Sequence, residues 1–418
     1  MITRDISNRI KLCIIEDKTF KSDFFAVDLI VPLTKETVTE NVLLASVLSR
    51  GTKSCESLAA MNRALYELYG ATLSSGALKK GDSLVLSFSI SYLKDRFTLT
   101  GKDNGRKAAA LLFETITSPA FKDGLFRRDY VESEIKNLRD DIAAEINDKR
   151  RYVLKRCTEE SLAGEPFGLS AVGYAEDLDK ITPESLVKRY NAALAEAKIF
   201  AFAFGEADET AMTESLLKAF DKDAPFYEPF TVSGKKPGKP VFLRESMAVK
   251  QAKLAIGFRA DPLDEFGQAE LNLFNFVYGA SPVSKLFMNV REKQSLCYYC
   301  ASVLYGKKGF MIVDCGIDAA NYEKAYDEIL RQLSDVRDRL ITEDEMKAAK
   351  KALKNAYKSL SDSAAAVHNW YLGCFVAGTS NTLEELYGAV DGVEADRVAD
   401  IASRFAPKTV FLLEPSAS

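Results

Sequence analysis

Apolar positions along the chain repeat with two periods, and the same order of elements occurs in both halves. Alternating or continuous apolar runs indicate strands, and apolar residues three or four apart indicate helices. In the first half, the predicted strands are 24–32, 83–92 and 199–205, and the predicted helices are 41–49, 56–69, 106–118, 127–162 and 182–194. In the second half, the predicted strands are 249–258 and 409–415 with a hairpin over 296–317, and the predicted helices are 266–278, 284–293, 320–337, 343–375 and 395–405.

The two halves are similar enough to indicate an internal duplication. The closing strands FAFAFG and VFLLEP lie about 210 residues apart, and so do two charged helical stretches. Between the halves, residues 221–240 hold four prolines, two glycines and four lysines without apolar periodicity, a composition typical of a linker. The pattern predicts an α+β protein of two homologous domains, 1–220 and 241–418, each a mostly antiparallel sheet flanked by helices. Two unrelated α+β domains are the alternative.

Composition and charge argue against several classes of function. The net charge of −4 and the pI of about 5.5 provide no basic field for nucleic acid. No apolar run is long enough to span a membrane, and the first residues lack the pattern of a secretory signal. Seven scattered cysteines indicate reduced thiols. We therefore expect a cytoplasmic protein that binds neither nucleic acid nor membrane.

Two candidate chemical features carry little weight by themselves. The CYYC stretch contains Cys297 and Cys300, but no helix start follows it and no second CxxC exists. We interpret these cysteines as strand residues, not redox or metal ligands. His368 is the single histidine of the chain, so chemistry that needs two imidazoles is excluded for this chain alone. We expect His368 to be a packed or surface residue.

Four stretches follow the order of motifs in a known family: LSRGTKS after the apolar helix, EPFG at 165–168, GYAEDLDKITPESLVKRYNAAL at 173–194, and SKLFMNVREKQSLCYYCASVLYGKKGF at 284–310. With these motifs, over nearly its whole length, the chain resembles the pitrilysin/insulinase family of zinc peptidases. The similarity is to the half-sized bacterial members that resemble mitochondrial processing peptidase. The last stretch is the most specific of the four.

Active members of this family carry an inverted zinc motif, H-x-x-E-H, on a helix just before a Gly-Thr pair. Two histidines one turn apart bind the metal, and the glutamate acts as general base. Counted back from Gly51 and Thr52, these positions are occupied here by Val42, Ala45 and Ser46. The resemblance therefore implies a peptidase fold without catalytic residues in this chain. Ordinary core helix is the alternative for this segment.

The third protein ligand of the family's zinc is a distant carboxylate, which would fall near Glu134 or Asp141. One carboxylate without histidines does not make a zinc site. We therefore expect this chain to bind no cofactor and expect zinc in a partner subunit.

The second half retains the arginine and tyrosine of the family's second-domain motif, at Arg291 and Tyr298. The resemblance implies that both hold substrate, since a guanidinium donates paired hydrogen bonds to a carbonyl or carboxylate and a phenol donates to an oxyanion. Local pairing of Arg291 with Glu292, and a structural strand position for Tyr298, are the alternatives.

These features predict a catalytically inactive homologue that holds substrate and forms the chamber of a heterodimeric zinc metallopeptidase, with no activity alone. The expected partners are a zinc-bearing HxxEH homologue and an unfolded or extended peptide; a homodimer is possible for the isolated chain. A structural, assembly or peptide-binding scaffold without a role in proteolysis is the alternative. A self-sufficient enzyme with another metal site, built from Asp, Glu and Cys, lacks any supporting cluster in the sequence.

Overall fold

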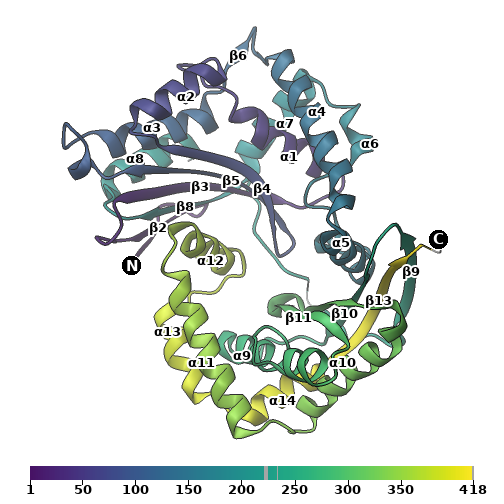
Figure 1. Ribbon diagram of the computed structural model, residues 1–418. Coiled ribbons are helices and arrows are strands. Elements are labelled where there is room, and N and C mark those ends of the chain that lie inside the picture. Colours follow the sequence, from purple (N-terminus) through teal and green to yellow (C-terminus); the bar gives the residue numbers. More distant parts are fainter. Residues whose placement is uncertain (221–224, 233, 417–418) are drawn as a thin grey trace. The chain divides into compact units, whose positions relative to one another are not determined.

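The computed structural model describes residues 1–220, 225–232 and 234–416, which form two compact units (Figure 1). Unit 1 comprises Met1–Ala143, Leu169–Phe230 and Ala364–Gly378, and unit 2 comprises Ala144–Gly168, Thr231–Ser363 and Thr379–Ser418. The predicted linker at 221–240 includes 221–224 and 233, which lie outside the described residues. The sequence interpretation treated each half as continuous, whereas each compact unit contains a segment from the other half.

Unit 1 is built on a six-stranded sheet in the order β1-β2-β8-β3-β5-β4. Its strands are β1 (Ile2–Asp5), β2 (Ile10–Ile15), β3 (Ser22–Pro32), β4 (Thr72–Lys80), β5 (Ser83–Leu93) and β8 (Lys198–Phe204). Neighbouring strands are antiparallel except β2 and β8. One face carries α1 (Val38–Leu48), α2 (Leu58–Glu67), α3 (Asn104–Thr117), α4 (Arg128–Ala144), α6 (Ala175–Leu178), α7 (Pro183–Glu196) and α8 (Glu209–Phe220). A small hairpin, β6 (Phe121–Lys122) and β7 (Leu125–Phe126), precedes α4.

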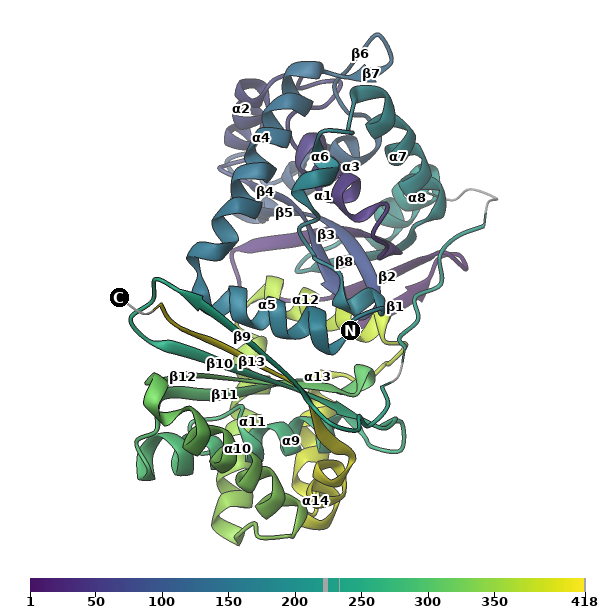
Figure 2. The same ribbon diagram turned by 90° about the vertical axis from the view of Figure 1, so that its right-hand side faces the viewer.

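Unit 2 repeats this plan with a five-stranded sheet in the order β11-β12-β10-β13-β9. Its strands are β9 (Val241–Met247), β10 (Ala252–Ala260), β11 (Cys297–Tyr305), β12 (Phe310–Ile317) and β13 (Phe405–Pro415). One face carries α9 (Gln268–Tyr278), α10 (Tyr322–Arg337), α11 (Glu343–Leu360), α13 (Leu383–Ala389) and α14 (Ala395–Arg404), as Figure 2 shows.

The strand orders of the two sheets match element by element. Strands β9, β13, β10, β12 and β11 stand in the places of β2, β8, β3, β5 and β4, and the parallel pair is β2 with β8 in one sheet and β9 with β13 in the other. The predicted fold class, α+β with two homologous and mostly antiparallel units, is confirmed. The predicted hairpin is also confirmed, with β11 and β12 joined by the turn Gly306–Lys308.

Two helices predicted as continuous are broken. The predicted helix 127–162 ends as α4 at Ala144 and resumes as α5 (Lys149–Ser161), where the Asp148 side chain caps the new helix by accepting from the backbone N–H of Arg150 and Arg151. The predicted helix 343–375 ends as α11 at Leu360 and resumes as α12 (Ala364–Val376). At each break the chain passes into the other compact unit.

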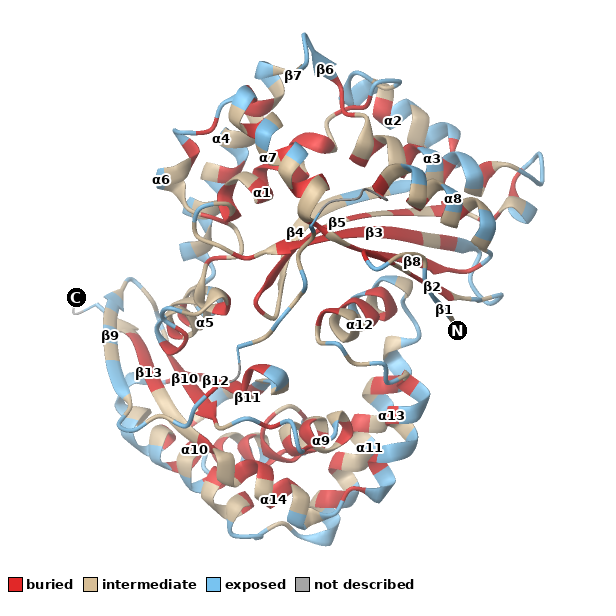
Figure 3. Ribbon diagram, turned by 180° about the vertical axis from the view of Figure 1, so that it is seen from behind, coloured by how far each residue is buried: buried red, intermediate tan, exposed pale blue. Residues whose placement is uncertain are grey.

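The second piece of each broken helix covers the otherwise open face of a sheet. Helix α12 packs on β3 and β8 in unit 1, and α5 packs on β10 and β13 in unit 2. The central strands β3, β8, β10 and β13 are thereby covered on both faces, and most of their residues are buried, as Figure 3 shows. None of the helices in the described part of the chain has the length and apolar character that a bilayer span requires.

Candidate functional site

Helix α1, which carries the three positions of the family's zinc motif, is a core helix. It is apolar on nearly all sides, and eight of its eleven residues are buried, as expected for a helix enclosed by protein. Ala45 is fully buried in the core of unit 1, and Val42 packs against that core. Ser46 lies one turn after Val42, on the same face, and is half-buried. The helix that carries the zinc motif in active relatives is therefore present. Its two histidine positions are Val42 and Ser46, its glutamate position is Ala45, and none of these side chains is a zinc ligand or a general base.

Glu134 on α4, one of the two candidates for the family's third zinc ligand, already forms an ion pair. Glu134 pairs with the guanidinium of Arg50, two residues after α1, and Arg50 also donates to Ser133 Oγ at 2.9 Å. Asp141 lies one helix turn from the end of α4 and is exposed. Glu134 is already paired with Arg50, and the remaining carboxylate of Asp141 has no imidazole beside it, so these side chains do not fit a zinc ion. Among the described residues, no cluster of three or more His, Cys, Asp or Glu could hold a metal.

Arg291 lies on an uncommon element, a π-helix over Leu286–Lys293. Such segments are rare and occur frequently at functional sites. The guanidinium lies above the ring of Phe287, with its carbon 4.5 Å from the ring centre, and pairs with Glu292 at 3.0 Å. The side chain is 38% exposed. Arg291 is thus held in place from beneath and remains open to solvent.

Tyr298 lies at the start of β11, which contacts the π-helix. The residue is 53% exposed, and its hydroxyl donates to Asp318 Oδ1 at 3.2 Å. This hydrogen bond and the charge of Asp318 raise the pKa of Tyr298 above its ordinary value, so the phenol is a proton donor at neutral pH. No hydrogen bond joins Arg291 to Tyr298 in the described part of the chain; each side chain is paired locally.

Cys297, between these two residues in sequence, lies beside two buried thiols. Cys297 and Cys300 are strand residues of β11, as predicted, and Cys315 faces Cys300 on β12. Hydrogen bonds from the Cys300 and Cys315 thiols lower the pKa of Cys297, and the positive charge of Arg291 lowers it further. Sequence spacing alone missed this group, because Cys315 comes from the other strand of the hairpin.

We expect Cys297 to react with iodoacetamide at pH 6 roughly tenfold faster than Cys55, since the thiolate is the nucleophile. Both residues are half-buried, so Cys55 is a matched control for access. Replacing Arg291 with Ala should slow the reaction of Cys297 and leave that of Cys55 unchanged. Mass spectrometry of peptides after timed alkylation measures both rates, and equal rates in the wild-type protein would contradict the expectation.

Two of the motifs quoted above meet inside unit 2. Glu165, from EPFG, pairs with Arg259 on β10 at 2.8 Å and with Lys308, from GKKGF, at 2.7 Å. Arg259 also donates to the backbone carbonyl of Lys308 at 3.1 Å. Phe167 packs edge-on against the ring of Tyr305. The motifs therefore describe a structural contact between the segment after α5 and the hairpin β11–β12.

His368, on α12, is buried and lies against the sheet of unit 1. Its Nε2 lies 2.6 Å from Oδ2 of Asp28, which is fully buried in the middle of β3. The expectation of a packed histidine is confirmed; the buried carboxylate beside it was not predicted from the sequence.

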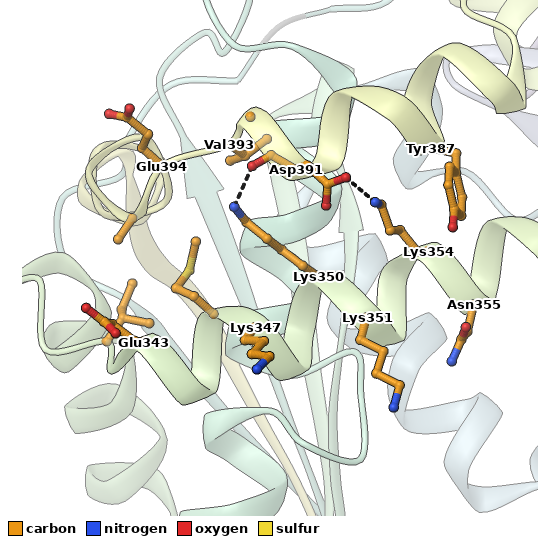
Figure 4. Close-up of a pocket in the computed structure, with 14 residues that line it drawn as sticks. Glu343, Lys347, Lys350, Lys351, Lys354, Asn355, Tyr387, Asp391, Val393 and Glu394 are labelled. Atoms are coloured by element: carbon orange, nitrogen blue, oxygen red, sulfur yellow. Dashed lines mark hydrogen bonds and ion pairs between the residues drawn. The ribbon is translucent and has the colours of Figure 1, made fainter.

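A cavity of about 740 Å³ in unit 2 lies between α11, α13 and the start of α14. Lys350 donates to the backbone carbonyl of Asp391 at 2.8 Å, and Lys354 pairs with the Asp391 carboxylate (Figure 4). Lys347 and Lys351 extend away from Asp391 and are exposed. Because the inward-facing lysines are already paired, we assign no ligand to this cavity.

Comparison with known proteins places these features in one family. A family profile described as "Peptidase M16 inactive domain" matches residues 180–353. The "Probable inactive metalloprotease YmfF" of Bacillus subtilis strain 168 is 30% identical over 410 residues, covering 96% of this chain and 95% of its own. The "Uncharacterized zinc protease YmxG" of the same organism is 26% identical over 200 residues, covering 46% of this chain and 48% of its own.

Solved structures agree with this placement. A conserved protein from Enterococcus faecalis V583 has a TM-score of 0.88 at 26% identity and covers 100% of this chain and 99% of its own. A peptidase M16 inactive domain from Pseudomonas fluorescens shares the fold, with a TM-score of 0.81 at 15% identity, covering 100% of this chain and 98% of its own. The chain belongs to the M16, or pitrilysin-like, peptidase family. It is an inactive homologue of the zinc enzymes in that family.

Proposed function

We propose that this chain is the substrate-holding subunit of a two-chain zinc peptidase, with the metal supplied by an HxxEH-bearing homologue. One observation carries the proposal: the positions of the zinc motif hold Val42, Ala45 and Ser46, while Arg291 and Tyr298 are exposed on a fixed support. An inactive fold used only as a scaffold has no need for an exposed guanidinium and phenol in this motif.

The placement of the two side chains supports a role in holding an extended peptide. Strand β11 is an edge of its sheet, so its outer backbone groups are available to pair with an added strand. Tyr298 lies on this edge strand, and Arg291 lies on the π-helix that contacts it. A peptide added along β11 would pass Tyr298, whose phenol donates a hydrogen bond, and Arg291 would bind a carbonyl or carboxylate of the same peptide.

The test is reconstitution with an HxxEH-bearing homologue from the same organism and a fluorogenic peptide in the presence of zinc. Cleavage should require both chains. Arg291→Ala and Tyr298→Phe should each lower kcat/KM by about 10- to 100-fold while the complex persists in gel filtration. Lys293→Ala, on the same helix, and Tyr305→Phe, on the same strand, are matched controls and should change kcat/KM less than about twofold.

The local pairs described above favour a second candidate, a peptide-binding or assembly scaffold without a role in proteolysis. Arg291 already pairs with Glu292, and Tyr298 already donates to Asp318. If the mixture cleaves peptide equally well with all four variants, or if the two chains do not associate, the scaffold replaces the proposed subunit.

A further inference from the structure

A second cavity, of about 410 Å³, lies in unit 1 between the start of β3, the end of β5 and the first turns of α3 and α8. We call it the acidic cavity, because five carboxylates line it: Asp23, Asp95, Asp103, Glu206 and Asp208. Its volume is within the usual range of small-molecule sites. None of its residues belongs to the site proposed above, and its function is independent of that proposal.

The charges around the acidic cavity do not balance. Lys94 lies 3.6 Å from Asp23, Arg96 pairs with Glu206 at 3.2 Å, and Arg106 pairs with Asp103 at 3.2 Å. Asp95 and Asp208 instead accept backbone N–H groups, from Gly105 at 2.8 Å and from Ala211 at 3.0 Å. The lining therefore has an excess of negative charge, which favours a cation as occupant.

The hydroxyl of Tyr92 also lacks a protein partner there, among the described residues. Tyr92 is only 5% exposed and lines the cavity, yet its hydroxyl makes no hydrogen bond to any residue that the structure describes. Burial, and then the charges of Asp23 and Asp95, raise the pKa of Tyr92, so its phenol is neutral. The hydroxyl therefore faces the cavity without a hydrogen bond to the described part of the protein, and a bound ligand can use it as donor or acceptor.

The remaining lining is apolar. Phe113, Ala109, Ala211 and Met212 lie at the α3 and α8 sides of the cavity, and Phe113 packs on Phe25 and Phe220 of the core. A bare metal ion would leave these groups without contact, whereas a short alkyl chain would cover them. The occupant is therefore cationic at one end and apolar along its body.

We propose that the acidic cavity binds an alkylammonium group, in which the ammonium lies between Asp23, Tyr92 and Asp95 and the alkyl chain lies on Phe113 and Met212. The group is carried either by a free aliphatic amine or by the lysine side chain of a peptide. In this arrangement the Tyr92 hydroxyl oxygen accepts a hydrogen bond from the ammonium, and the two carboxylates neutralise it.

The affinity of the acidic cavity for an ammonium group should depend on pH through Asp23. Burial raises the pKa of Asp23 to about 6, although the backbone N–H of Glu206 and the charge of Lys94 act in the opposite direction. The charged and titratable groups that face Asp23 are Lys94, Glu206 and Tyr92. Below pH 6 the carboxyl is protonated and loses its attraction for the ammonium. The affinity should therefore fall about tenfold between pH 7 and pH 5.

The experiment is calorimetric titration of the full chain with n-butylammonium, with Nα-acetyl-lysine amide, and with 1-butanol as the uncharged match. Butylammonium should bind and butanol should not. Tyr92→Phe should weaken binding about tenfold without lowering the melting temperature, because the hydroxyl has no partner to lose. Asp23→Asn should weaken it at least about tenfold, and Asp140→Asn, an exposed aspartate on α4, is the matched control for loss of one charge.

Each outcome decides the proposal. Binding of acetyl-lysine amide at least as tight as that of butylammonium identifies a peptide lysine as the source, and binding of butylammonium alone identifies a free amine. Equal binding of butanol, an unchanged affinity in Tyr92→Phe, or an equal loss in Asp140→Asn overturns it. If Asp23→Asn does not fold, Tyr92→Phe and the pH dependence still decide.

Discussion

Replacing Glu165 with Ala should lower the stability of unit 2 by about 3–5 kcal/mol, the usual cost of breaking a buried ion pair from one side. Arg259 is 4% exposed and Lys308 is 2% exposed, and both pair with this one carboxylate. Without Glu165, both buried cations lose the carboxylate that they share. Thermal unfolding followed by calorimetry, which separates the transitions of the two units, measures the effect.

Two further variants show whether charge balance is the cause. Lys308→Met removes one buried cation and leaves the pair of Glu165 and Arg259 neutral, so it should cost much less than Glu165→Ala. Glu160→Ala removes the same charge as Glu165→Ala from an exposed position near the end of α5 and should change stability by less than about 0.5 kcal/mol. A Glu165→Ala protein as stable as Glu160→Ala would show that the buried cations are hydrated or paired in another way.

This contact gives the EPFG and GKKGF stretches a structural meaning. Gly168 ends the EPFG turn, and a Cβ there would lie 2.4 Å from the carbonyl oxygen of Leu162. Glycine is therefore required by the close approach of backbone, while Glu165 and Phe167 fasten the turn to Lys308, Tyr305 and Phe310. In this chain the two stretches hold unit 2 together, a role that does not require the zinc ligands.

The elements with strong periodicity could be predicted, among them the edge strand β11 as part of the hairpin, whereas β1, β2, β4 and β9 could not. The predicted strands 24–32, 83–92, 199–205, 249–258 and 409–415 all lie within or overlap β3, β5, β8, β10 and β13. These are central or doubly covered strands whose apolar pattern is strong. Strand β4, TLSSGALKK, was missed because an edge strand is half-exposed and tolerates polar residues and glycine.

The breaks in the two long helices were missed for another reason. Ser361, Asp362 and Ser363 separate α11 from α12, and these residue types favour caps and turns over helix interiors. The apolar periodicity continues on both sides of them, and it concealed the break. The exchange of α5 and α12 between the units cannot be predicted from local pattern, because it depends on which sheet each apolar helix covers.

Some features of the candidate site could likewise be predicted from the sequence, and others could not. The absence of zinc ligands at Val42, Ala45 and Ser46 could be read from residue types alone, because neither apolar side chains nor an isolated hydroxyl replaces imidazole. The local partners of Arg291 and Tyr298, the thiols beside Cys297 and the hydroxyl of Tyr92 required the tertiary structure. Each depends on residues that are distant in sequence or on the other strand of a hairpin.

Replacing His368 with Phe should destabilise unit 1 by about 3 kcal/mol, because it leaves Asp28 with no hydrogen-bonded partner in the interior. Asp28 is fully buried, and its Oδ1 makes no hydrogen bond to any described residue, so the contact of Oδ2 with His368 at 2.6 Å is its principal compensation. Phe preserves the packing, since the His368 ring already lies among Phe24, Phe200 and Phe202.

The double variant Asp28→Val with His368→Phe is the decisive comparison, since replacing both members of a buried pair with apolar groups is often neutral or stabilising. Its melting temperature should lie near or above that of the wild type, while that of His368→Phe alone should fall by roughly 5–10 °C. Lys80 is the nearby cation; burial lowers its pKa, and the charge of Asp28 acts in the opposite direction. If His368→Phe alone is as stable as the double variant, then Lys80 and not His368 balances Asp28, and α12 is held on the sheet of unit 1 by its apolar contacts alone.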